Sequence, residues 1–556
     1  MTTTAAVWYQ PDGYDTSGAR LVGRQAAGEQ FLKAWVRHSA ATVLPCVSPS
    51  KKEYEDFVQR TQPWMPRGKS PQWIPARWLE GLAKVGTLYR PDPALADYAW
   101  QRRSYDQRAY SICGVTHTIC SRAVMEFFAD LAIAPLQSWD ALICTSDAVK
   151  DTLDQVLQHW QEYLHDRHGG GNPRSLVQLP VIPLGVDCEA LAPNANSARL
   201  RAGVRKSLEM QDDDVAILYV GRLNFYAKAH PLTSFQALSR VAKATKKRLY
   251  LIQVGWFENE REEKSFRAAT KQFCPGVDSV FLDGRLPEVR QQAWAAADIF
   301  MSLSDNIQET FGLTPLEAMA SGLPVICSDW NGYRATVRHE VDGFRIPVVM
   351  PPPGVGEDLA RDHWNDLLAY NSFIARAAMA TAVDVDQCTR TLLQLVENPA
   401  LRKQLGSSGL ARARAEFDWR HIIARYEALW SELAARRKTD AEHAPRRRGT
   451  PSNPLAIDPF RLFKHYASET LTPETRLQVG PEANEISLAA INGDWMMSFG
   501  SDAHLPVDQW QSLLAHLRMQ GETTVGELLS LYAGKEVPLW RTIGYLLKID
   551  AVRIKD

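Results

Sequence analysis

Residues 305–330 have the sequence DNIQETFGLTPLEAMASGLPVICSDW. Glu309 and Glu317 flank a Phe-Gly-Leu-Thr-Pro turn, and an apolar helix and a strand over 325–327 follow. A helix start beside a strand offers free backbone N–H groups to an anion. Two acids next to such a turn suit the hydroxyls of a sugar or a ribose. Acids near a helix start also stabilise the helix dipole, so the stretch alone leaves a purely structural role open.

The composition is that of an ordinary globular protein. The chain has 556 residues, of which 45% are hydrophobic and 23% charged, and its formal net charge is −1. This length predicts several domains, and the balanced charge provides no field that would favour nucleic acid or an anionic membrane. Eight scattered cysteines without a C-x-x-C pair indicate buried thiols in a reducing compartment. No apolar run predicts a transmembrane helix and no signal peptide is apparent, so we expect a cytoplasmic protein.

The first part of the chain is predicted to form a doubly wound α/β domain over residues 1–190. Ligands of such domains bind beyond the carboxyl ends of the strands. This rule places Gly23 and Arg24 in a ligand-facing loop, although the loop lacks a G-x-G-x-x-G fingerprint and a plain connection is the alternative. His117 follows a predicted strand and is a candidate polar contact or acid–base group. The alternative for His117 is a histidine satisfied by local backbone bonds.

Three local features of this domain can be predicted. Residues 42–47 indicate a second strand, and Pro45 within it favours an edge position because proline cannot donate to a strand ladder. The Pro- and Trp-rich residues 61–80 indicate an irregular surface segment. Ser146 is placed to cap the helix that begins at Asp147.

A second α/β domain is predicted over residues 191–435. It begins with a continuous apolar strand at 215–222, which suits a parallel sheet covered on both faces. Arg222 and Lys228 follow within one loop, before a helix. Two cations beside a helix start form a good diphosphate site, because Arg binds two phosphate oxygens through its fork and Lys supplies a mobile point charge. Two solvated surface cations are the alternative.

Four motifs in order carry a resemblance to a known family. They are Ile182-Pro-Leu-Gly-Val-Asp187, Val220-Gly-Arg-Leu223 with Lys228, Ala297-Asp298 before Ile-Phe-Met-Ser, and Glu309 to Glu317 with Glu-Ala-Met-Ala-Ser-Gly-Leu-Pro. Over residues 5–430 the chain resembles the retaining glycosyltransferases of family four, the glycosyl transferases group 1. The resemblance implies a GT-B fold, in which two Rossmann-like domains face a cleft and the second domain holds most of a nucleotide sugar.

The resemblance also implies roles for single residues. Arg222 and Lys228 would neutralise the donor diphosphate without a metal, by stabilising the charge that develops on the leaving group. Glu309 would contact the transferred sugar, and His117, on a looser local match, would lie near it. Glu317 would hold the ribose hydroxyls. The other donor-binding positions are Gly221, Phe311, Gly312, Leu313 and Thr314, and the acceptor-side positions are Gly23 and Arg24.

The expected chemistry is transfer with retention of the anomeric configuration. Attack on the face that the phosphate leaves is favoured, because neither Glu309 nor Glu317 is a safe candidate for the carboxylate nucleophile of a double displacement. Two departures from the family pattern matter. Residues 329–334 (DWNGYR) stand where many relatives carry a Gly-Gly and an acid, which leaves the sugar open. The Pro-rich insertion at 348–356 is either a lid or a surface excursion.

The tail is predicted to hold a linker and an accessory domain. The charged residues 436–454 indicate a solvated tether. Residues 455–556 have helical patterns at 507–519, 524–532 and 538–547, which predict a small, mainly α domain. Three short helices allow a winged-helix-like unit, but a protein-interaction or self-association module is favoured because the region is not notably basic.

We therefore expect a retaining, metal-independent hexosyltransferase that uses no cofactor. Its co-substrates would be a nucleotide sugar, UDP- or GDP-linked, and a hydroxyl-bearing acceptor. Its location would be cytoplasmic or peripheral at a membrane. The alternative from another class is a non-catalytic or regulatory protein of GT-B fold that acts through residues 455–556.

Overall fold

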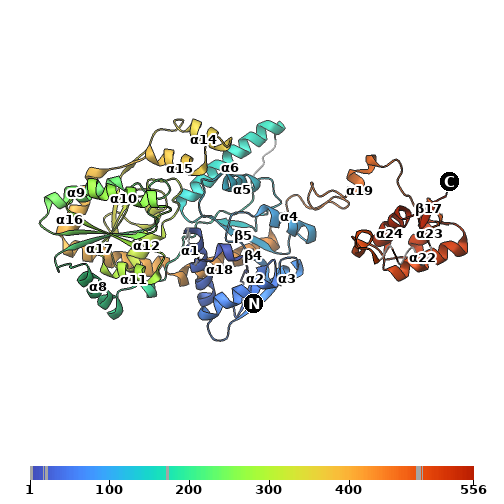
Figure 1. Cartoon of the computed structure of the whole chain (residues 1–556), viewed down its shortest axis with the longest axis horizontal. Helices are drawn as coiled ribbons and strands as arrows, with labels where there is room; N and C mark the ends of the chain where they lie inside the picture. Colours follow the sequence, from blue (N-terminus) through green and yellow to red (C-terminus); the bar gives the residue numbers. More distant parts are fainter. Residues whose placement is uncertain are drawn as a thin grey trace. The chain divides into compact units, whose positions relative to one another are not determined.

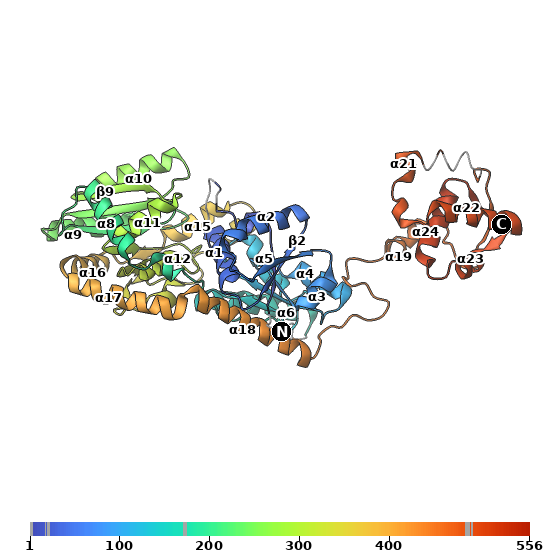
Figure 2. The same ribbon diagram turned by 90° about the horizontal axis from the view of Figure 1, so that it is seen from below.

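The computed structural model describes residues 4–16, 18, 23–170, 175–483, 490 and 493–555. These residues form two compact units, which divide between Asn453 and Pro454. Figures 1 and 2 show the elements of both units from two directions.

The first unit begins with a six-stranded sheet whose strands are all parallel, in the order β3-β2-β1-β4-β5-β6. Its strands are β1 (Ala6–Trp8), β2 (Val43–Ser48), β3 (Ser70–Pro75), β4 (Thr87–Tyr89), β5 (Ser111–Val115) and β6 (Ala141–Ile143). The helices between them are α1 (Gly23–His38), α2 (Lys51–Thr61), α3 (Leu79–Val85), α4 (Ala96–Tyr105), α5 (Arg122–Asp130) and, after β6, α6 (Asp147–His168). The strand order reverses between β1 and β4, so the loops after these two strands meet at a switch point.

A second six-stranded parallel sheet follows in the order β12-β11-β10-β7-β8-β9. Its strands are β7 (Val215–Val220), β8 (Leu249–Gly255), β9 (Val277–Asp283), β10 (Ile299–Ser302), β11 (Val325–Ser328) and β12 (Gly343–Ile346). The helices of this domain include α7 (Cys188–Leu191), α8 (Ala195–Ser207), α9 (Leu232–Ala244), α10 (Glu260–Phe273), α11 (Pro287–Ala296), α12 (Leu313–Ala320), α13 (Tyr333–Thr336), α16 (Val385–Glu397) and α17 (Pro399–Arg412). Its switch point lies between β7 and β10.

Both sheets thus have the strand order of a doubly wound Rossmann-like domain, which confirms the predicted GT-B fold class. The last helix of the first unit, α18 (Trp419–Thr439), packs on the first of these domains. Trp419 and Tyr426 contact Phe31 of α1, with ring centroids 6.3 and 5.2 Å apart. Figure 2 shows α18 running along the first domain after it leaves α17.

A two-helix excursion leaves the second domain after β12 and returns before α16. Its neck is an antiparallel ladder between β13 (Val348–Val349) and β14 (Ala382–Val383). Between these strands lie α14 (Glu357–Trp364) and α15 (Tyr370–Met379). The insertion predicted at 348–356 is therefore only the start of a longer folded segment.

Of three local predictions for the first domain, two are wrong and one is confirmed. β2 is not an edge strand, because it pairs with both β1 and β3, and Pro45 lies opposite Gln72. A single proline removes one ladder donor, and the other residues of β2 keep both neighbours. The segment predicted to be irregular supplies β3 and α3, because pairing with β2 stabilises a strand that starts and ends near proline. Ser146 does cap α6, since its side chain accepts from Val149 N at 3.3 Å.

The charged stretch predicted as a solvated tether is attached to the first domain up to residue 453. Arg108 donates to the carbonyl of Asp440 at 2.5 Å, and Arg103 donates to that of Ser452 at 2.6 Å. Gln137 donates to the carbonyl of His443 at 3.0 Å. Side chains of the folded domain thus satisfy backbone carbonyls of the stretch, a pairing that its own composition does not reveal.

The second unit combines helices with a small sheet. The predicted helices correspond to α22 (Val507–Gln520), α23 (Val525–Leu531) and α24 (Glu536–Lys548). Two short helices, α19 (Pro459–Leu462) and α21 (Trp495–Ser498), precede them. An antiparallel sheet in the order β16-β15-β17 was not predicted, because its strands β15 (Arg476–Val479), β16 (Thr523–Thr524) and β17 (Val552–Ile554) are very short.

Two further observations concern the chain as a whole. All eight cysteines are free, and all except Cys120, which is partly exposed, are buried as expected. Within the described residues, no helix has the length and apolarity needed to cross a bilayer.

Candidate functional site

The loop that follows β7 brings two predicted cations to the switch point of the second sheet. Gly221 has a φ of +154°, and a Cβ on it would lie 3.0 Å from the Tyr219 hydroxyl and 3.6 Å from Lys228 Cε. The Tyr219 hydroxyl donates to the carbonyl of Arg222 at 3.0 Å. The Arg222 guanidinium is partly buried and forms no ion pair with any residue that the structure describes. A cation held near a sheet edge without a carboxylate partner is available to an anion.

The loop that follows β10 faces these cations with a carboxylate. Lys228 Nζ and the Glu309 carboxylate form an ion pair whose side chains are 25% and 9% exposed. The Asn331 side chain donates to the carbonyl of Glu309 and holds the loop from its other side. The pair therefore joins the loops after β7 and β10, the two strands that flank the switch point.

Two amide side chains fix the same loops to each other. Asn306 Nδ2 donates to the carbonyl of Tyr226 at 2.7 Å, and Gln308 Nε2 donates to that of Ala227 at 2.9 Å. Asn306 also accepts from the backbone N–H of Gln308 at 2.9 Å through its side-chain oxygen. The positions of Lys228 and Glu309 are thus set by backbone contacts of their immediate neighbours.

The helix α12 begins directly beyond this loop and presents unpaired donors. Gly312 occupies its N-cap position with a φ of +82°, and no side chain caps the helix. A Cβ on Gly312 would lie 2.0 Å from the Tyr333 ring, so only glycine fits here. The first N–H groups of a helix have no partner within the helix, so those of Leu313 and Thr314 can bind an anion. Phe311 is 2% exposed and packs in the hydrophobic core of the second domain, so its ring is not part of the exposed surface.

Glu317 lies on the same helix but outside the ion-paired cluster. Burial raises the pKa of its carboxyl, while Arg290 of α11 and a hydrogen bond with Gln30 of α1 act in the opposite direction. Glu317 is therefore where the two domains approach each other, on the side of α12 that faces α1.

Asp305 is a buried carboxyl of the β10 loop that the sequence did not single out as a site residue. It is 5% exposed, and burial raises its pKa to about 7. The backbone N–H of His230 donates to Asp305 at 3.3 Å. Its protonation changes near neutral pH, which sets it apart from an ordinary aspartate.

In the first domain, His117 follows β5 and contacts the backbone of the β4 loop. Its Nε2 lies 3.0 Å from the carbonyl oxygen of Pro91. Burial lowers the pKa of His117 to about 4, and the nearby Arg24 charge acts in the same direction. The neutral ring must carry its proton on Nε2 because a carbonyl only accepts, so Nδ1 is left as a hydrogen-bond acceptor.

The two acceptor-side candidates stand at the start of α1. Arg24 forms an ion pair with Asp12 at 2.7 Å. A Cβ on Gly23 would meet nothing within 4 Å, so packing does not require glycine there. The glycine that packing requires is Gly28, where a Cβ would lie 2.2 Å from the carbonyl oxygen of Gly13.

The structure thus forms two groups of predicted residues. Arg222, Lys228 and Glu309 meet with Gly221 and the start of α12, whereas His117 and Arg24 lie together in the first domain. Among the described residues, no hydrogen bond or ion pair joins one group directly to the other. The first domain nevertheless reaches the β10 loop, because Ser146 Oγ donates to the carbonyl of Thr310 at 3.1 Å.

Several residues that shape the site were not predicted from the sequence. They are Tyr219, Asp305, Asn306, Gln308, Asn331, Tyr333 and Tyr370. Only Asp305 and Asn306 carried a usable signal, because polar residues directly after a buried parallel strand lie at the ligand-binding edge. The others act through contacts between distant segments, which a local pattern does not show.

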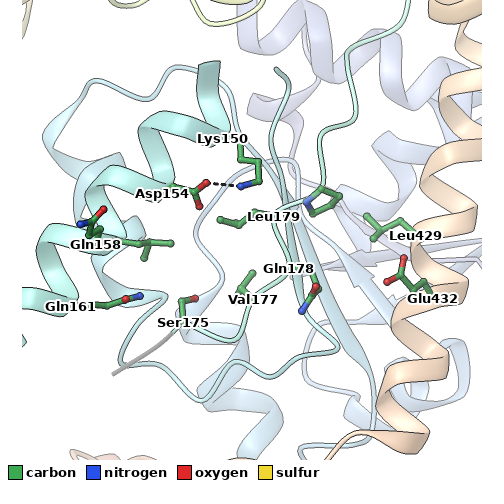
Figure 3. A pocket seen from close by; sticks show the side chains of 12 residues that line it. Lys150, Asp154, Gln158, Gln161, Ser175, Val177, Gln178, Leu179, Leu429 and Glu432 are labelled. Atoms are coloured by element: carbon green, nitrogen blue, oxygen red, sulfur yellow. Dashed lines mark hydrogen bonds and ion pairs between the residues drawn. The ribbon is translucent and has the colours of Figure 1, made fainter. Parts of the chain in front are cut away.

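A cavity of about 550 Å³ lies elsewhere in the first domain, between α6, residues 175–180 and α18 (Figure 3). Its lining includes Lys150, which pairs with Asp154 as Figure 3 shows. The lining cation is therefore neutralised within its own helix, which makes this cavity a poor diphosphate site. In the part of the chain that the structure describes, no group of three or more His, Cys, Asp or Glu side chains is arranged to hold a metal ion.

Part of the second domain is similar to a known family. Residues 214–361 match the family described as Glycosyl transferases group 1. The chain is 28% identical over 297 residues to a D-inositol 3-phosphate glycosyltransferase of Geodermatophilus obscurus, in an alignment that covers 52% of this chain and 53% of the relative. It is 25% identical to the sulfoquinovosyl transferase SQD2 of Arabidopsis thaliana, over 44% of this chain and 38% of that protein. The chain thus spans about half the length, or less, of these curated relatives.

Among solved structures, the chain is similar to Anabaena Alr3699/HepE in complex with UDP. The TM-score is 0.48 at 15% identity, over 77% of this chain and all of the other. The Rossmann-like fold of the two domains is therefore supported by the strand order of the two sheets and by the family match.

Proposed function

We propose that the protein transfers a sugar, a hexose, from a nucleotide sugar to a hydroxyl acceptor with retention of the anomeric configuration, a proposal that the match of residues 214–361 to the glycosyl transferases group 1 supports. The donor would be UDP- or GDP-linked, and the transfer would need no metal. The observation that carries the proposal is the unpaired Arg222 beside the Lys228–Glu309 pair and the uncapped start of α12.

This arrangement suits a diphosphate leaving group. The Arg222 guanidinium and the free N–H groups of Leu313 and Thr314 would bind phosphate oxygens. These donors would offset the negative charge of the diphosphate inside a partly buried site. Lys228 pairs with Glu309, and a diphosphate, with its higher negative charge, would draw Lys228 away from the carboxylate. Fixed positive groups that face the departing phosphate stabilise the transition state more than the ground state.

The same exchange would release Glu309 for the sugar. A carboxylate accepts hydrogen bonds from two hydroxyls, which is the contact that the family resemblance implies for this position. Asn331 holds the backbone carbonyl of Glu309, and the released carboxylate would accept from sugar hydroxyls. We therefore favour attack on the face from which the phosphate departs over a double displacement, which would need this carboxylate at the anomeric carbon.

His117 would assist as a neutral acceptor. A pKa of about 4 leaves the ring uncharged at neutral pH, and its Nδ1 can accept from a sugar hydroxyl. A group with this pKa is a weak base at pH 7, so we assign His117 to binding rather than to proton transfer.

The test begins with a panel of nucleotide sugars screened by thermal shift, because a ligand that binds the folded state raises its unfolding midpoint. Hydrolysis of the best donor is then followed without acceptor in the wild type, in Arg222→Ala and in Glu309→Ala. Arg248→Ala is the matched control, since Arg248 lies 2.6 Å from Asp278 on an exposed surface.

We expect both site variants to lose donor turnover and the control to retain it. Turnover that survives both site changes would show that the proposed site is wrong. A chain that binds no nucleotide sugar would favour the regulatory alternative.

A further inference from the structure

The two-helix excursion between β13 and β14 has an ordered interior of its own. Leu368 and Ile374 are buried, and the rings of His363 and Phe373 stack with their centroids 4.7 Å apart. His363 Nδ1 lies 3.0 Å from the carbonyl oxygen of Leu368. The segment is thus a folded element that can hold a side chain in a defined place.

One contact of the excursion is made on the surface of the first domain. Arg122, at the start of α5, donates to the carbonyl of Trp364 and to the Asp366 carboxylate, each at 3.0 Å. Its guanidinium also lies 5.1 Å from the centre of the Trp364 ring. Figure 1 shows the excursion beside α5, although the two belong to different domains.

A second contact reaches the candidate site. The Tyr370 hydroxyl donates to Gln308 Oε1 at 2.8 Å and lies 3.2 Å from Cys120 Sγ. A hydroxyl has one proton to donate, so the Cys120 thiol must be the donor in the second contact. Cys120 belongs to the loop after β5 that also carries His117. Tyr370 therefore connects the first domain to the β10 loop.

Gln308 links Tyr370 to both residues of the Lys228–Glu309 pair. Its Nε2 donates to the carbonyl of Ala227, which precedes Lys228, and Gln308 itself precedes Glu309. The amide has its oxygen on Tyr370 and its nitrogen on Ala227, and flipping it would set Oε1 against the Ala227 carbonyl, where neither atom can donate. The Tyr370 hydroxyl thus fixes the amide that holds the loops after β7 and β10 together.

We propose that Tyr370 is a positioning residue, which couples docking of the first domain to the alignment of Lys228 and Glu309 for the donor diphosphate. The inference rests on the proposed function for its effect on turnover, but its structural part is independent of it. Arg222 belongs to the same neighbourhood, because its charge stabilises the ionised form of Tyr370 against the effect of burial. When the domains separate, the Tyr370 hydroxyl loses its contact with Cys120, which helps to hold it against Gln308, and the charged loops lose part of their alignment.

Tyr370→Phe is the variant that tests this role, because it removes the hydroxyl and keeps the ring on the excursion. Tyr163→Phe is the matched control, since Tyr163 lies on α6 and is 54% exposed. With the best donor from the thermal-shift screen, we expect Tyr370→Phe to lower kcat/KM by about threefold to tenfold, which is the effect of one lost hydrogen bond. The control should stay within twofold of the wild type.

A double-variant cycle separates positioning from packing. Gln308→Ala removes the acceptor, so adding Tyr370→Phe to it should cost less than twofold more. Losses that multiply in the double variant would overturn the proposal, because the two residues would then act independently.

Hydrogen exchange gives a measurement that does not require turnover. We expect backbone amides of residues 224–230 and 306–312 to exchange at least threefold faster in Tyr370→Phe than in the wild type, with β7 and β8 unchanged. A wild type without donor turnover would contradict the proposed function, whereas the exchange difference would still support the role of Tyr370. Unchanged exchange in both segments would overturn that role whatever the turnover.

Discussion

The two Rossmann-like domains share one strand order, but the arginines beside their switch points differ in their partners. In the first domain, Arg90 follows β4 directly and is 7% exposed. Its guanidinium lies 4.7 Å from the centre of the Trp8 ring and 4.3 Å from that of Tyr98, and it forms an ion pair with Asp92 at 2.6 Å. In the second domain, Arg222 also lies beside the switch point, but it follows β7, which corresponds to β1, and it has no carboxylate partner among the described residues.

The difference shows that the fold fixes where a ligand can bind, while the loops decide whether the charge there is available. Arg90 is neutralised and enclosed by aromatic rings, so it stabilises its domain. Arg222 has no such partners, and the neighbouring Lys228 has one that a stronger anion can displace. The same topology therefore yields a structural cation in one domain and a binding cation in the other.

The largest effect is expected from Arg222→Ala. Removing a preorganised cation that faces the leaving group should lower donor turnover by about 100-fold to 1000-fold. The unfolding midpoint should change little, because no ion pair is broken. Steady-state kinetics and thermal unfolding of the purified variant check both parts. A large loss of stability with normal turnover would show that Arg222 is a structural cation and not a binding cation.

Arg90→Ala should show the opposite profile. The substitution leaves Asp92 without its partner and removes the contacts with Trp8 and Tyr98, so the free energy of unfolding should fall by about 2–4 kcal/mol. Turnover per folded molecule should fall far less than in Arg222→Ala. Urea unfolding measures the first quantity and kinetics at a low temperature the second. Unaltered stability would mean that Arg90 is not a structural cation.

Asp305→Asn sharpens the account of the second switch point through pH. The folded-state pKa of about 7 lies above the ordinary value of 3.8, so the stability that Asp305 contributes in its protonated form is lost as pH rises toward and through 7. The asparagine variant avoids this loss. Relative to the wild type, its free energy of unfolding should rise by about 2–3 kcal/mol between pH 5 and pH 8. Equal differences at both pH values would contradict the raised pKa.

The smallest effect is expected from Glu309→Gln on binding of a nucleoside diphosphate without sugar. The neutral amide frees Lys228 and removes a negative charge near the phosphates, so affinity should rise by about threefold to tenfold, within the range for partly buried ion pairs. Isothermal titration calorimetry measures it, with Glu263→Gln as control because Glu263 pairs with Arg267 on the surface. A fall in affinity would show that Glu309 supports the diphosphate rather than competing with it.

The sequence predicted the elements that local patterns determine. The apolar run at 215–222 and the polar residues after it located β7 and the cations, and the stretch 305–330 located α12 and β11. Two parallel sheets followed from the alternation of short apolar runs and helical patterns. Ser146 was recognised as a cap because capping depends on residue type and position alone.

Features that depend on distant contacts were not predictable in this way. β2 is interior despite Pro45, because β3 pairs with it from a segment whose prolines suggest no strand. Residues 440–453 attach to the first domain through side chains of Arg103, Arg108 and Gln137, which lie more than three hundred positions earlier. Tyr370 joins Cys120 and Gln308 from an excursion of which the sequence indicated only the Pro-rich start at 348–356.

The most direct test of the central claim is a crystal structure of the protein with a bound nucleoside diphosphate. The account predicts the diphosphate between the Arg222 guanidinium and the first turn of α12, with Lys228 moved from Glu309 onto a phosphate oxygen. A diphosphate bound at the first switch point beside Arg90, or an intact Lys228–Glu309 pair with the nucleotide elsewhere, would contradict it.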